Sequence, residues 1–203
     1  MAKWWDKGTK IPYTDQNFQK IIDFYLFNCP CETEKGTKEN KTYTKVSQRA
    51  TTFRSQGWTG GNINILIACM KKTSSGQLEY RHFKSSAKIE EEVIKIEKGS
   101  SLSDKSFEMI ALIERSDMKL TSSIFYYIRN AFAHGSFSVI NDKGKKTYFF
   151  ESAKDTIIKA QIRLREDTLI KWIKDFRVSP KELQSALKDE RRKKKKADKN
   201  KAA

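Results

Sequence analysis

The sequence has few of the features that mark exported or membrane-spanning proteins. Its 203 residues include three cysteines, an odd number that fits reduced thiols better than a disulfide framework. No apolar run approaches the roughly 18 to 20 residues of a membrane-spanning helix. The first ten residues, MAKWWDKGTK, also lack the apolar region of a signal peptide. We therefore expect a soluble cytoplasmic protein without a membrane partner.

Residues that bind metal ions are also scarce. The chain has two histidines, His82 and His134. Cys29 and Cys31, with distant Cys69 and His82, supply enough ligand types for zinc, but they lack the usual spacing of two residues between paired cysteines. Free thiols are the better interpretation, and His82 either contacts RNA or is simply an exposed side chain. We expect no metal and no other cofactor.

Acidic residues are outnumbered, because 41 lysines and arginines face 25 aspartates and glutamates, which leaves a net charge of +16. Such an excess attracts polyanions such as nucleic acid. The C-terminal segment 188–203 is particularly basic, and we expect it to be disordered because its adjacent like charges repel one another. Its basic run is either a nucleic-acid contact or only a solubilising tail, and it comprises Arg191, Arg192, Lys193, Lys194, Lys195 and Lys196.

The hydrophobic content of 37% is enough for one core, so we predict a single domain over 1–187. Apolar residues at helical spacing predict a first helix over 14–28. The region 29–84 is uncertain. Within it, NINILIACMKK favours a helix, although a buried strand is the alternative.

The segment 85–178 predicts the core of a helical bundle, so the fold class we expect is mainly α. Helical spacing predicts four helices, at about 85–99, 103–115, 116–135 and 153–177. After the third, the period changes to two on either side of NDKG, which predicts a short β-hairpin. Ser179, Pro180 and Glu182 predict a capping box that begins one more helix.

The third of these helices carries the most informative residues, in SIFYYIRNAFAHG. Arg129 and Asn130 are followed by His134 and by Gly135, a typical C-terminal cap. Five residues on an ideal helix turn about 500°, so the side chains of Arg129 and His134 would point about 140° apart. Two arrangements would reconcile them: the helix frays at its last turn, or a second copy supplies the partner group.

This stretch resembles the signature of the HEPN superfamily, in which an Arg and a following polar residue precede a His near the end of a helix. Arg129, Asn130 and His134 fill these positions. The resemblance covers about 15 residues and implies a helical bundle, a homodimer with a composite site, and cleavage of RNA without a metal. It also suggests a toxin or antiphage effector, with an antitoxin or other regulatory protein as a possible partner.

The chemistry is coherent without the resemblance. RNA carries its own nucleophile, the ribose 2′-hydroxyl, so an enzyme need only move protons and stabilise charge on the phosphate. Histidine suits the proton transfer, because its unperturbed pKa is about 6.5. Arginine presents a fixed fork of donors to phosphate oxygens. We therefore predict catalytic roles for Arg129 and His134, with Asn130 orienting either group or the substrate.

Other interpretations remain open. Arg129 alone fits a surface ion pair, and His134 alone fits a helix cap that interacts with the helix dipole. The rival function is a non-catalytic basic module that binds nucleic acid or a partner protein and cleaves nothing. A metal-dependent nuclease is disfavoured, because the sequence has no convincing cluster of carboxylates and histidines.

Overall fold

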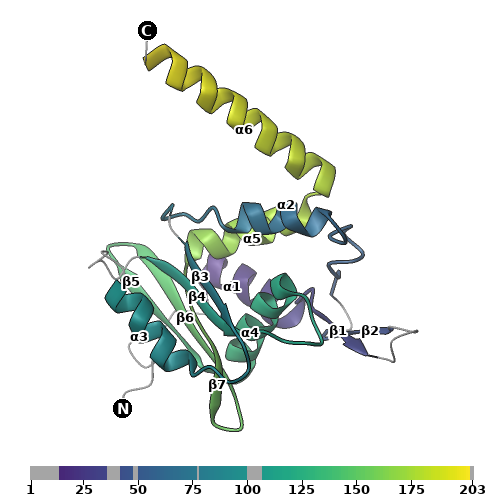
Figure 1. Ribbon diagram of the computed structural model, residues 1–203, viewed down its shortest axis with the longest axis vertical. Helices are drawn as coiled ribbons and strands as arrows, with labels where there is room; N and C mark the ends of the chain where they lie inside the picture. The colour runs from purple at the N-terminus through teal and green to yellow at the C-terminus, as the bar shows by residue number, and fades with distance from the viewer. Residues whose placement is uncertain (1–13, 36–41, 48–49, 77, 100–106, 202–203) are drawn as a thin grey trace.

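The fold is built on a five-stranded mixed sheet with helices on both faces (Figure 1). The computed structural model describes residues 14–35, 42–47, 50–76, 78–99 and 107–201. One face of the sheet is covered by α3, whereas α1, α4 and α5 lie on the opposite face (Figure 1). The last helix, α6, projects away from this body (Figure 1).

Helices and strands are interspersed along the described chain. The helical elements are α1 (Gln16–Ile22), the π-helix η1 (Asp23–Phe27), α2 (Asn62–Met70), α3 (Ile89–Gly99), α4 (Leu120–Ala133), α5 (Glu166–Arg177) and α6 (Pro180–Lys201). The strands are β1 (Glu32–Lys35), β2 (Thr42–Lys45), β3 (Leu78–Phe83), β4 (Glu108–Ile113), β5 (Phe137–Asp142), β6 (Lys145–Lys154) and β7 (Ile157–Arg165). Strands β1 and β2 form a separate hairpin, and the larger sheet has the order β3-β4-β7-β6-β5.

Strand β4 shows why the sheet has two hydrophobic cores. Every residue of this strand is buried. Ile110 and Leu112 belong to the larger core with α4 and α5, while Met109, Ala111 and Ile113 belong to the smaller core beneath α3. Side chains of a strand alternate between faces, so a strand covered on both sides is apolar throughout. Strand β3 pairs with β4 in parallel, and α3 makes the crossover between them.

Two tight turns connect the antiparallel strands β5, β6 and β7. Asp142 pairs with Lys145 across the loop of Lys143 and Gly144, and both loop residues have positive φ, 48° and 81°. The β6–β7 loop likewise has positive φ at both of its residues. Such two-residue loops match the twist of the strands that they connect.

The predicted mainly α fold class is wrong, because the structure is α/β with 44% helix and 27% strand. Two predicted helices account for the difference. The segment expected to form a helix over 103–115 contains β4, and the first half of the helix expected over 153–177 is β7. The hairpin after α4 does form, but it belongs to the main sheet and is not an insertion in a helical bundle.

Several local predictions are confirmed. The first helix forms as α1 and η1, the helix in 62–72 forms as α2, and the helix that carries the motif forms as α4. The capping box before α6 is present: the Glu182 amide donates to Ser179 Oγ at 3.3 Å, and the Ser179 amide donates to the Glu182 carboxylate at 3.1 Å. In the basic segment the backbone continues α6 to Lys201.

Candidate functional site

Helix α4 is a largely buried element with one narrow stripe open to solvent. Nine of its fourteen residues are buried, so few positions remain for contact with a ligand. Tyr126, Arg129 and Asn130 are partly exposed, and Ala133 and the following His134 are exposed. These five positions recur at intervals of three and four, which places them on one continuous band of the helix surface, with Arg129 and His134 at its two edges. The polar residues of the motif are thus on the accessible side.

The end of α4 presents His134 to solvent. The Ser136 amide donates to the Ala131 carbonyl at 2.8 Å, and the Gly135 amide donates to the Phe132 carbonyl at 3.2 Å. This pair of bonds is a Schellman motif, which needs a left-handed residue, and Gly135 has a φ of 64°. His134 is the C-cap residue, with φ −99° and ψ 4°. The sequence therefore correctly identifies where the helix ends.

Arg129 is the most unusual side chain of this stripe. Its Nε is buried without a hydrogen-bond partner. Among the residues that the structure describes, no carboxylate forms an ion pair with its guanidinium. A partly buried cation of this kind has lost water without gaining a full set of partners, which costs free energy. An incoming anion would supply the missing partner.

Two buried cysteines pack against the same helix. Cys31 Sγ lies 3.1 Å from the Ser122 carbonyl and Cys29 Sγ lies 3.7 Å from that of Phe125, while the two sulfur atoms are 3.2 Å apart. Burial raises the pKa of the Cys31 thiol well above its usual value, and Cys29 raises it further. The positive charges of Arg129 and Arg115 act in the opposite direction and lower this pKa.

A second arginine lies next to this region. Arg115 holds Asp117 through two hydrogen bonds, at 2.9 and 2.5 Å, and its guanidinium carbon lies 4.3 Å from the centre of the Tyr126 ring. The positive charge of Arg115 also lowers the pKa of the Cys31 thiol. Unlike Arg129, however, it already has a carboxylate partner. The sequence gives no signal for this arrangement, because Arg115 and Tyr126 belong to different elements.

The structure brings together some of the predicted site residues and separates others. Arg129, Asn130 and His134 share the C-terminal end of α4, but within the described part of the chain no hydrogen bond joins their side chains. The basic run 191–196 belongs to α6, which projects from the side of the body that carries α2 (Figure 1). The run is therefore remote from the end of α4 within one protomer.

His82 and the three cysteines lie in surroundings that need no functional role to explain them. His82 Nε2 lies 3.2 Å from a Glu114 carboxylate oxygen, and both side chains are about half exposed. Cys29, Cys31 and Cys69 are free and buried. In the described ranges no three side chains of His, Cys, Asp or Glu are grouped so that they could hold a metal ion. The zinc alternative thus has no site among these residues.

No protein-family model matches this chain, and no curated protein or solved structure matches it either. The resemblance to the HEPN signature therefore stays a prediction that depends on the α4 motif alone. Every helix in the described ranges is too short or too polar to cross a membrane.

Proposed function

We propose that this protein is a metal-independent endoribonuclease whose active site is at the C-terminal end of α4. The observation that carries the proposal is the Arg129 guanidinium, which is partly buried and lacks a carboxylate partner among the described residues. Cations in proteins are normally paired when they lose contact with water. An RNA phosphate fits this position by charge and by the geometry of the guanidinium fork.

The proposed chemistry assigns one task to each residue of the motif. Arg129 binds the scissile phosphate and stabilises the charge that develops on its oxygens. His134, exposed at the helix end, transfers protons between the 2′-hydroxyl, the phosphate and the departing 5′ oxygen. Asn130 orients one of these groups. The 2′-hydroxyl attacks phosphorus, the bond to the 5′ oxygen breaks, and the products are a 2′,3′-cyclic phosphate and a 5′-hydroxyl.

A homodimer would complete the site. Arg129 and His134 diverge on a single helix, and the reaction needs one group that removes a proton and one that delivers a proton. Two copies of α4 related by a two-fold axis would place two arginines and two histidines around one phosphate. We place this activity in the cytoplasm, and a toxin or antiphage role with a regulatory partner protein is the biological setting that we propose.

The test is cleavage of RNA by the purified protein in EDTA. We expect cleavage that leaves 2′,3′-cyclic phosphate ends, spares DNA and disappears in His134→Ala. The matched control is His82→Ala, which removes the other histidine of the chain and should leave cleavage unchanged. Cleavage that persists in His134→Ala, or that needs an added metal ion, would contradict the proposal.

A mixing experiment tests the composite site. Arg129→Ala and His134→Ala proteins should each be inactive, and mixed dimers should recover part of the activity, because each subunit supplies the group that the other lacks. Mixtures that stay inactive although the subunits exchange would argue against a site shared by two protomers.

A second candidate function is supported by α6. This helix of 22 residues ends in the basic run and projects from the body, which suits non-specific binding of a polyanion (Figure 1). A non-catalytic module would bind RNA and DNA with a steep salt dependence, would lose this binding when residues 188–203 are removed, and would cleave neither. Binding that is unaffected by Arg129→Ala would favour this function.

A further inference from the structure

The β1–β2 hairpin and the start of α4 together form a second surface, at the other end of α4 from His134. The hairpin stands apart from the main sheet (Figure 1), and all four residues of β2 are exposed. Where it approaches the body there is a hollow of about 40 Å³. Side chains from β1, β2, the loop before α2 and the start of α4 line it, among them Glu32, Tyr43, Arg54, Lys119 and Ser122.

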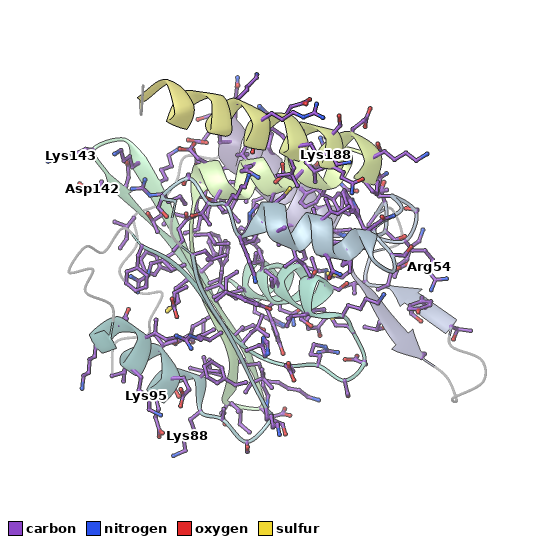
Figure 2. All side chains as sticks on the ribbon, turned by 45° about the horizontal axis from the view of Figure 1, so that its top comes forward. Arg54, Lys88, Lys95, Asp142, Lys143 and Lys188 are labelled. Carbon is purple, nitrogen blue, oxygen red and sulfur yellow. The ribbon has the colours of Figure 1, made fainter. Side chains whose placement is uncertain are left out.

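This surface combines exposed cations with an aromatic ring. The guanidinium carbon of Arg54 lies 3.9 Å from the centre of the Tyr43 ring. Figure 2 shows Arg54 beside the hairpin, on the opposite side of the molecule from Lys143. Arg54 and Lys119 are both exposed, and neither forms an ion pair with a carboxylate among the described residues. Stacking on a ring uses the face of a guanidinium and leaves its N–H edge for a phosphate.

The hollow and Arg129 both involve side chains of α4. Ser122 lines the hollow, and its carbonyl is 3.1 Å from the Cys31 thiol. Arg129 follows Ser122 by seven residues. Seven residues return to nearly the same side of a helix and advance about 10 Å along its axis. A strand of a few nucleotides is long enough to span this separation.

We propose that this surface, made by Tyr43, Arg54 and Lys119, holds single-stranded RNA next to the bond that Arg129 and His134 cleave. The inference rests on the proposed cleavage at α4 and specifies its substrate class. Arg54 and Lys119 bind phosphates on one side of the scissile bond, and Tyr43 contacts a base. A base must be unpaired to reach an aromatic side chain, so the surface favours single strands over duplexes.

Binding is measured separately from cleavage with a 2′-O-methyl RNA 12-mer of unstructured sequence, which lacks the nucleophile. Arg54→Ala/Lys119→Ala should weaken binding about tenfold and reduce the log–log salt slope by about 1.4, the value for two lost contacts with single-stranded phosphates. Tyr43→Ala should weaken binding by a similar factor. The charge-conserving variant Arg54→Lys/Lys119→Arg should retain most of the salt slope, which separates lost contacts from misfolding.

The matched control is Lys143→Asn, which removes one exposed charge on the opposite side of the molecule and tolerates the positive φ of that position. It should bind like the unaltered protein. With cleavable RNA, Tyr43→Ala and Arg54→Ala/Lys119→Ala should raise KM and leave kcat within about twofold.

Unchanged binding in both alanine variants would overturn the inference, and so would equal or tighter binding of the same oligonucleotide as a duplex. These failures would leave cleavage by Arg129 and His134 standing. Conversely, if the unaltered protein cleaves no RNA, the proposed function fails, while the comparison of 2′-O-methyl RNA binding still decides whether this surface holds single strands.

Discussion

Asp15, the N-cap residue of α1, forms an ion pair with Lys146 in β6, 131 residues later in the chain. Lys146 also lies 3.3 Å from a Glu166 carboxylate oxygen at the start of α5. One lysine thus joins the first helix to the sheet and to α5. The hydrogen bond from Lys146 lowers the pKa of Asp15, and the bond from the Phe18 amide at 2.9 Å lowers it further.

This pair predicts a loss of stability in acid. The folded-state pKa of Asp15 is below its unfolded value of about 3.9, so its contribution is fully present above about pH 4 and is lost as the pH falls through the folded pKa. Asp15→Asn keeps the helix cap but removes the charge. Urea unfolding at pH 7 and pH 3 should therefore give curves that differ less for Asp15→Asn than for the unaltered protein. An equal pH dependence in the two proteins would contradict this.

Replacing Arg129 by alanine should reduce activity without loss of stability, whereas replacing Arg163 by alanine should reduce stability. We expect Arg129→Ala to abolish cleavage, with a loss of about 10²- to 10³-fold in kcat, yet to leave the free energy of unfolding unchanged or higher, since the guanidinium has no partner to lose among the described residues.

The comparison variant is Arg163→Ala. Arg163 is buried, pairs with Glu97 and has its guanidinium carbon 4.7 Å from the centre of the Phe107 ring. Its removal should cost about 2 kcal/mol, because the buried side chain loses its contact with the Phe107 ring and its ion pair with Glu97. Urea denaturation measures both values, and a comparable destabilisation in Arg129→Ala would mean that Arg129 has a structural role.

Gly135 is required by backbone conformation and not by lack of space. A Cβ built at this position would meet nothing within 4 Å, but the φ of 64° disfavours any other residue. Gly135→Ala should therefore cost about 1 to 2 kcal/mol. Gly135→Asn should cost less, because asparagine tolerates this conformation. Thermal unfolding measures the difference, and equal melting temperatures for the two variants would show that the turn does not keep this geometry.

The three thiols should be protected in the folded protein. Burial raises the pKa of Cys31 and of Cys69, which leaves little thiolate to react at neutral pH. We expect Ellman's reagent to label the native protein slowly and to titrate three thiols in denaturant. Fewer than three thiols after unfolding without reductant would indicate a disulfide, and rapid labelling of the native protein would show that the Cys29–Cys31 segment is not buried against α4.

Local patterns predicted the elements that have one buried side. Helix α4 was predictable because its apolar positions recur with helical spacing and Gly135 ends it. The hairpin of β5 and β6 was predictable from a period of two around a turn. Strand β4 was not predictable, because EMIALI is buried on both faces and has no period that separates a strand from a helix.

The misassigned strand β7 has a related cause. Ile158, Ile162 and Leu169 fit the spacing of a helix, so together with the apolar residues of α5 they predict one continuous helix. In the structure Ala160, Ile162 and Leu164 face the larger core, while Arg163 points to the other face and contacts Glu97 on α3. The sequence pattern does not show that α3, from elsewhere in the chain, covers polar residues of β7 such as Arg163.

The sequence by itself determined the identity and order of Arg129, Asn130 and His134, the helix that carries them and the turn that exposes the last of them, because each depends on neighbours within a few residues. Only the tertiary structure decided that Arg129 lacks a carboxylate partner among the described residues, and that the Ser122 carbonyl, 91 residues after Cys31, lies against the Cys31 thiol. Such contacts form only when distant segments pack together. Burial and unmatched charge depend on that packing, and no local pattern reports them.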